Sequence, residues 1–180
     1  MDASKIGELI DAEGFECKGT LDPKGLVTLQ DVRDACAVDK CQHYDKCWAC
    51  PPACGTIEEY ESKMHEYSNG YVFQTVVILE STLDWEGISA AMENHENRVR
   101  ALADTIAAQA GDEPYMLLTA GSCTLCKECT YPDKPCRFPS KRLTSMEAAG
   151  LNVTNTCKLA QIPYNHGKNS LAYSSCVLFN

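Results

Sequence analysis

The chain has 180 residues, of which 44% are hydrophobic, and a formal net charge of −9 at pH 7. This length and hydrophobic content allow one sizeable core, so we expect a single domain that spans residues 1–180. No apolar run approaches the ~20 residues of a membrane span, and the excess of acidic residues argues against nucleic acid as a partner.

The charge is unevenly distributed along the chain. Residues 1–120 hold 9 Lys and Arg against 22 Asp and Glu, a balance of −13, whereas residues 121–180 hold 7 against 3, a balance of +4. A basic C-terminal third can receive a small anionic substrate or an acidic redox partner. It can also offset the negative charge of thiolates that hold a metal cluster.

The N-terminal third predicts few regular elements. Residues 1–16 have the pattern of a short amphipathic helix, and residues 25–29 predict a first strand. Thr56 and Glu59 then have the spacing of a capping box, so a helix is expected to begin there and to end at Asn69-Gly70.

The centre of the chain predicts a strand, a long helix and a second strand. Residues 71–79 form an almost continuous β-branched and aromatic run, which is typical of a strand covered on both faces. Asp84 can cap the helix that follows, and Gly111 and Pro114 end it. Residues 115–119 predict the second strand. Such a unit is right-handed and its two strands are parallel.

The remaining elements complete an α/β fold. Short helices are expected at residues 145–149 and 156–161, and a final strand at residues 171–179. We therefore predict a small mixed, largely parallel sheet with flanking helices and two inserted cysteine-rich metal-cluster loops, residues 36–54 and 123–136. The second loop directly follows a predicted strand, at the edge of the sheet where open α/β folds place their ligands.

Cysteine is the most informative residue type, with 12 in the chain, and the second loop has the most diagnostic spacing. Three thiolates spaced C-x2-C-x2-C converge on one point and suit a 4Fe–4S cluster. Pro132 and Pro135 stiffen the segment that returns the fourth cysteine to the same cluster. Zinc, which usually takes two separated C-x2-C pairs, is the alternative metal. We predict one closed site formed by Cys123, Cys126, Cys129 and Cys136.

The first loop holds five cysteines, one more than a 4Fe–4S cluster requires. A second such cluster is our preferred interpretation, with zinc as the alternative because the spacing is looser. The thiol left over can be a buried cysteine, an exchangeable ligand or a redox-active group. The spacing leaves open which four bind among Cys36, Cys41, Cys47, Cys50 and Cys54.

Three cysteines lie outside the loops. Cys17, Cys157 and Cys176 are expected to be core residues, although with one spare cysteine of the first loop they could form a third set of four. A disulfide scaffold is not expected, because residues 1–5 lack a basic region followed by an apolar core and C-x2-C pairs close only strained loops. We therefore expect a cytoplasmic protein.

Three motifs together carry a resemblance to a known family. They are Cys36-x4-Cys41-x2-Tyr44 leading to Cys50-Pro51-Pro52, Gly121-x-Cys123-x2-Cys126-x2-Cys129-x6-Cys136-Arg137-x-Pro139, and Ser145-Met146-Glu147-Ala148-x-Gly150. With these motifs the chain resembles, over about residues 33–178, the predicted metal-binding proteins called domain of unknown function twenty-two eighty-four. The resemblance implies an iron–sulfur protein of anaerobic microorganisms without an assigned reaction.

The same resemblance ranks the ligands of the first loop. It implies that Cys36, Cys41 and Cys50 bind the metal and leaves the fourth ligand open. Asp45 stands where members of the family typically have glycine, and Cys47 and Cys54 look like additions to the commoner pattern.

Two classes of function fit these clusters, and a third applies if the metal is zinc. Electron transfer to a partner protein is favoured, because closed four-cysteine clusters pass single electrons without further residues. The alternatives are an iron–sulfur enzyme or activation factor with an open or substrate-facing cluster, and a zinc-stabilised binding module. His166 and Lys168 are the candidate catalytic residues, since their loop could bind an anion or supply a proton. A polar turn is the simpler interpretation of that loop.

Overall fold

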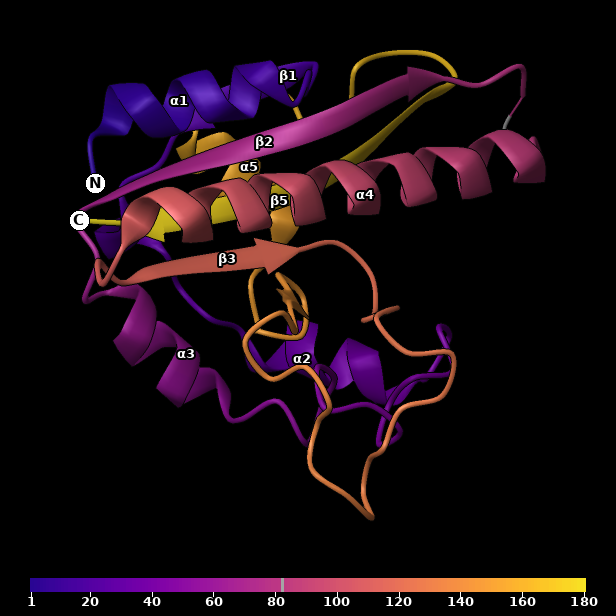
Figure 1. Cartoon of the computed structure of the whole chain (residues 1–180). Coiled ribbons are helices and arrows are strands. Elements are labelled where there is room, and N and C mark those ends of the chain that lie inside the picture. The colour runs from indigo at the N-terminus through magenta and orange to yellow at the C-terminus, as the bar shows by residue number, and fades with distance from the viewer. Residues whose placement is uncertain (82) are drawn as a thin grey trace.

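The protein, described here by a computed structural model that covers residues 1–81 and 83–180, contains a five-stranded mixed sheet with helices on both faces (Figure 1). The order of the strands across the sheet is β1-β2-β5-β3-β4. Their bounds are β1 Cys17–Thr20, β2 Asn69–Ile78, β3 Tyr115–Thr119, β4 Thr144–Ser145 and β5 Ser170–Phe179.

Antiparallel pairing dominates the sheet, so the expectation of a largely parallel sheet is wrong. β5 is antiparallel to β2 along their whole length, from Asn69 opposite Phe179 to Ile78 opposite Ser170. β5 is also antiparallel to β3, and β1 is antiparallel to β2. Between the described strands, parallel pairing is confined to β3 and the two-residue β4. β2 and β3 do run in the same direction, but β5 lies between them.

The helices form two layers, one on each face of the sheet (Figure 1). α1 and α4 cover one face, where their apolar side chains pack on Phe73, Leu117 and Phe179. The other face packs on Met64 at the end of α3, on α5 and on the segments around Leu26 and Met146. The bounds are α1 Ala3–Ala12, the 3₁₀ helix η1 Pro23–Gly25, α2 Gln30–Ala37, α3 Ile57–Met64, α4 Trp85–Ala110 and α5 Val153–Leu159.

Local capping signals predicted the starts of α3 and α4 correctly. Thr56 and Glu59 form the expected capping box at the start of α3, although α3 ends at Met64, before Asn69. Asp84 caps α4 by accepting a hydrogen bond of 2.9 Å from the Gly87 amide. These caps satisfy amides that have no partner within the helix.

Two predicted elements differ from the structure. Residues 25–29 do not form a strand, because the chain there leaves η1 and makes only an isolated bridge between Thr28 and Leu151; the first strand is β1. Residues 145–149 do not form a helix. The Met146 amide donates a hydrogen bond to the carbonyl oxygen of Thr119 at 2.9 Å. Residues 144–145 therefore pair with β3 as the short strand β4.

None of the helices in the described part of the chain combines the length and the hydrophobicity that crossing a bilayer requires.

His95, on α4, packs against the sheet and is fully inaccessible to solvent. Its Nδ1 lies 2.8 Å from Thr75 Oγ1 and its Nε2 lies 2.8 Å from Ser175 Oγ. Burial, aided by the nearby positive charge of Arg98, lowers the pKa of His95 to about 4. The imidazole is therefore neutral at pH 7 and joins α4 to two strands.

We predict that this histidine makes the fold less stable in mild acid. The ordinary pKa of histidine is 6.5, so below that pH the unfolded chain binds a proton that folded His95 does not bind until about pH 4. The free energy of unfolding should fall by about 3 kcal/mol between these limits and then level off. Denaturant titrations of the wild type and His95→Gln across this range test it. An equally steep pH dependence in the variant would contradict the assignment.

Candidate metal centres

The two cysteine-rich loops lie together beyond the C-terminal end of β3, on the side of the molecule away from α1 and β1 (Figure 1). Cys47, Ala49 and Cys50 of the first loop are buried, and Cys123 and Cys129 of the second loop pack against them. The contact between the loops thus consists largely of thiols.

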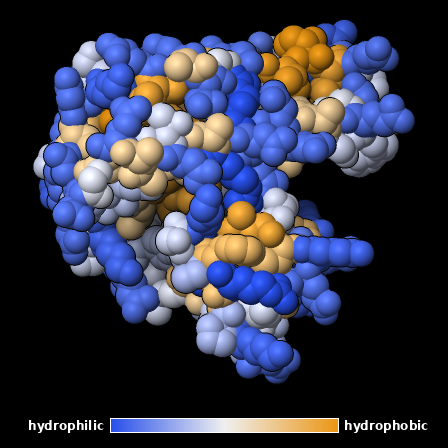
Figure 2. Space-filling view, in the orientation of Figure 1, coloured by the Kyte–Doolittle hydropathy of each residue, from blue (hydrophilic) through white to orange (hydrophobic). Residues whose placement is uncertain are grey.

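Two aromatic residues hold the outer part of this contact. The rings of Trp48 and Tyr131 meet edge to face with their centroids 4.9 Å apart. Trp48 Nε1 donates to the carbonyl oxygen of Lys134 at 3.0 Å, and the Tyr131 hydroxyl donates to Asp45 at 2.7 Å. Each loop therefore anchors the other. Figure 2 shows the surface hollowed between these loops and the first turns of α4.

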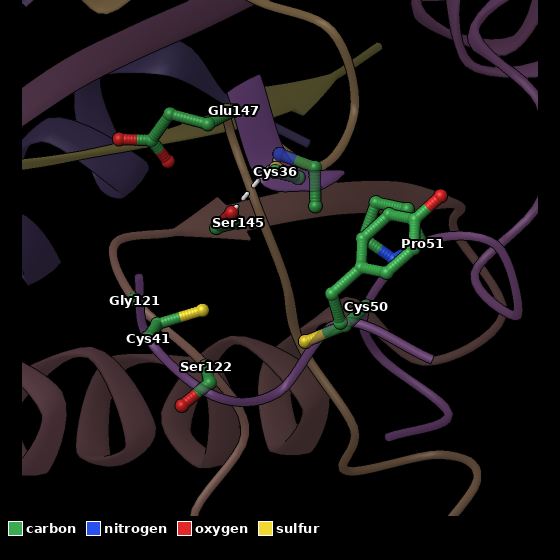
Figure 3. A pocket seen from close by; sticks show the side chains of 10 residues that line it. Cys36, Cys41, Cys50, Pro51, Gly121, Ser122, Ser145 and Glu147 are labelled. Carbon is green, nitrogen blue, oxygen red and sulfur yellow. Dashed lines mark hydrogen bonds between the residues drawn. The ribbon is translucent and has the colours of Figure 1, made fainter. Parts of the chain in front are cut away.

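Three thiols line a first cavity of about 180 Å³, which we call cavity A. α2 supplies Cys36, and the loop after it supplies Cys41 and Cys50. The sulfurs of Cys41 and Cys50 point toward one another across the cavity (Figure 3). The rest of the wall comes from segments that follow β3 and β4 and from the first loop, namely Tyr44, Pro51, Gly121, Ser122, Ser145, Glu147 and Ala148.

Five thiols line a second, smaller cavity of about 20 Å³, which we call cavity B. The cavity is small because Cys47 contacts both Cys123 and Cys129. These thiols would have to move apart to admit a metal cluster. The five are Cys47, Cys123, Cys126, Cys129 and Cys136, and Trp48, Arg137, Phe138 and Arg142 complete much of the wall.

The structure therefore divides the five cysteines of the first loop between different environments. The three that the family resemblance singled out share cavity A, whereas Cys47 joins the second loop at cavity B. Cys54 lies on neither wall. Its Sγ is 3.9 Å from the carbonyl oxygen of Ala148 and 4.0 Å from that of Gly55.

The three remaining cysteines lie in or near the sheet. Cys157 and Cys176 are fully buried in the core, and Gln74 Nε2 donates to Cys157 Sγ at 3.4 Å. Cys17 is half-buried on β1. None of these three lines cavity A or cavity B.

Three of the wall thiols, Cys36, Cys47 and Cys123, hold their protons more tightly than an ordinary cysteine. Burial raises the pKa of Cys129, but backbone hydrogen bonds of Tyr131 and Trp48 and contact with Cys47 outweigh it, so this pKa is lowered. Burial, followed by the charge of Glu147, raises the pKa of Cys36. Contact with Cys47, followed by burial, raises the pKa of Cys123. Contact with Cys123 lowers the pKa of Cys47, but contact with Cys50 and burial outweigh it and raise this pKa to about 11. A metal that binds here must displace these protons and bring positive charge to the thiolates.

Glu147, Ser145 and Ser122 were not assigned to a site by sequence reasoning. Burial raises the pKa of the Glu147 carboxyl. Ser145 Oγ accepts a hydrogen bond of 3.0 Å from the Ala148 amide, which shapes the turn after β4 (Figure 3). The only signal for Ser145 and Glu147 was their place in a family motif, which carries no chemistry by itself. Ser122 occupies an unspecified position of its motif and had no signal.

His166 and Lys168 lie in the segment between α5 and β5, just before Ser170, which pairs with Ile78 at the end of β2. His166 Nε2 lies 2.9 Å from Gln74 Oε1. Neither residue lines cavity A or cavity B.

Within residues 1–81 and 83–180, no three His, Cys, Asp or Glu side chains are arranged to hold a single metal ion.

We predict that metal loading protects the cysteines of the cavity walls from alkylation and leaves the others unchanged. Cys41 is the best reporter because it is exposed and lines cavity A. Its labelling by iodoacetamide should fall by about tenfold or more on loading, because a bound thiolate is not a free nucleophile. Cys17 is the matched control. Protection of Cys54 equal to that of Cys41 would contradict its place outside the walls.

Comparison with known proteins connects these cavities to a family. A family model described as "Predicted metal-binding protein (DUF2284)" matches residues 19–179, which include both cysteine loops. Searches of curated proteins and of solved structures gave no match. The description of the family specifies metal binding without a metal or a reaction.

Proposed function

We propose that this chain, which belongs to the predicted metal-binding protein family DUF2284, holds two 4Fe–4S clusters and passes single electrons to a partner protein. One cluster would bind in cavity A through Cys36, Cys41 and Cys50. The other would bind in cavity B through Cys123, Cys126, Cys129 and Cys136, with Cys47 between the two sites. Such clusters supply one-electron redox chemistry.

The adjacency of the two cavities carries this proposal. Cys47 lines cavity B and Cys50 lines cavity A, and three residues of chain span at most about 11 Å. Two groups held by these walls would therefore be near neighbours. A short distance between two clusters allows an electron to pass from one cluster to the other.

The donor set fits iron–sulfur clusters. Cysteine thiolates are soft ligands that suit such clusters, and the described walls of the two cavities hold eight cysteines, three in cavity A and five in cavity B. Trp48 and Tyr131 close the outer contact between the loops and would limit the access of water to cavity B. Limited access of water is one of the factors that tune the potential of a metal site.

Charge supports an acidic redox partner that docks at cavity B. Arg137 and Arg142 line this cavity, and Phe138 beside them is 43% exposed. These residues belong to the basic third of an otherwise acidic chain. Opposite charges steer two proteins into contact. A small anionic substrate that binds in the same region is the alternative. The proposal also places the protein in the cytoplasm, because thiols stay reduced there.

Chemical analysis after anaerobic purification tests the proposal. We expect about eight irons and eight sulfides per chain, and an EPR signal after reduction. About one zinc per site without sulfide would contradict the proposal and support the zinc-stabilised binding module instead.

A cysteine variant tests the assignment of cavity B. Replacing Cys123, Cys126 and Cys129 together by Ala leaves cavity B with only Cys47 and Cys136. Two thiols are too few to hold a cluster, so we expect the iron count to fall from about eight to about four, with an equal loss of sulfide. Cys17→Ala is the control and should keep both counts, because Cys17 lines neither cavity. Eight irons in the triple variant would show that cavity B does not hold a cluster.

A further inference from the structure

Cavity A offers three thiols to a cluster that has four ligand positions. Of the nine cysteines in the two loops, three line cavity A and five line cavity B, and every one of them lies within the described residues. The ninth, Cys54, lies outside the walls, against the carbonyl oxygens of Gly55 and Ala148. A cluster bound in cavity A would therefore keep one iron without a cysteine ligand.

We propose that cavity A, loaded as in the proposed function, is a binding site for a small neutral molecule with an oxygen or nitrogen donor, which takes the fourth position. An open ligand position on a metal is the usual place where a substrate binds. The volume of about 180 Å³ limits the ligand to a few atoms beside the cluster.

The wall of cavity A determines the class of ligand. Its polar side chains besides the thiols are Tyr44, Ser122, Ser145 and Glu147, and no Lys, Arg or His is among the described residues that line it. These groups offer hydrogen bonds without a positive charge. An anion would lie beside thiolates and Glu147 with no cation on the described wall to pair with, which disfavours its binding. A neutral ligand avoids this repulsion.

Nearby side chains that could alter this picture are engaged elsewhere. Figure 3 shows the carboxyl group of Glu147 turned away from the sulfurs of Cys41 and Cys50. The guanidinium of Arg33, the cation nearest to Cys36, donates to the carbonyl oxygens of Ala148 and Gly55. Cys47 contacts Cys50, but its side chain lines cavity B with the thiols of the second loop and not cavity A. The fourth position is thus left to a molecule from solution.

Ligand titration of the loaded, reduced protein tests the inference. Imidazole at about pH 8 is a neutral nitrogen donor, and acetate is an anion of similar size. We expect imidazole to change the EPR signal of one of the two clusters, and acetate to require at least about tenfold higher concentration. No response to imidazole, or an equal response to acetate, would overturn the inference.

Two variants separate the possible fourth ligands. Ser145→Cys adds a thiol to the wall of cavity A and should abolish the imidazole response with the iron count unchanged. Cys54→Ala should keep both the response and the count, and loss of one cluster in this variant would show that Cys54 closes the site. A persistent response in Ser145→Cys would place the ligand outside cavity A and overturn the inference.

Iron retention gives a second measurement that does not depend on the probe. Mild oxidation should release about one iron in eight from the wild type, because that iron has no protein thiolate, and none from Ser145→Cys. Full retention by the wild type would overturn the inference while leaving the two-cluster proposal intact. The absence of iron and sulfide from the purified protein would overturn both.

Discussion

The turn from Cys47 to Cys50 lies buried between the two cysteine loops and supplies one thiol to each cavity. The Cys50 amide donates to the carbonyl oxygen of Cys47 at 3.0 Å, and the Asp45 amide donates to that of Pro51 at 2.8 Å. These hydrogen bonds fix the turn from within. Because thiols of the second loop pack directly against it, the positions of both cavity walls depend on this one contact.

The sheet provides the rigid side of cavity A. β3 ends at Thr119, whose carbonyl oxygen holds the turn after β4 by accepting from the Met146 amide. Gly121, with a φ of 72°, then lets the chain pass so close to α4 that a Cβ would lie 1.9 Å from Met92 Cε. A larger residue here would displace the Met92 side chain and would have to adopt a positive φ that L residues rarely take. Gly121 therefore lets the start of the second loop pack closely against the Met92 side chain of α4.

Sequence patterns predicted the features that local chemistry determines. The capping groups of Thr56 and Asp84 act on amides within one turn, and β3 has the predicted bounds, residues 115–119. The insertion of β5 between β2 and β3 depends on pairing across more than a hundred residues, which no local pattern records. The same limit applies to the site. Spacing counted the thiols of the first loop but could not show that Cys47 and Cys50 face different cavities.

The Cys47–Cys50 turn also bears on how the two sites would fill. Admission of a cluster to cavity B requires Cys47 to separate from Cys123 and Cys129, and Cys47 is tied to Cys50 through the hydrogen bond of the turn. A shift of this kind changes the wall of cavity A. The turn therefore couples the shape of the wall of cavity A to the occupancy of cavity B.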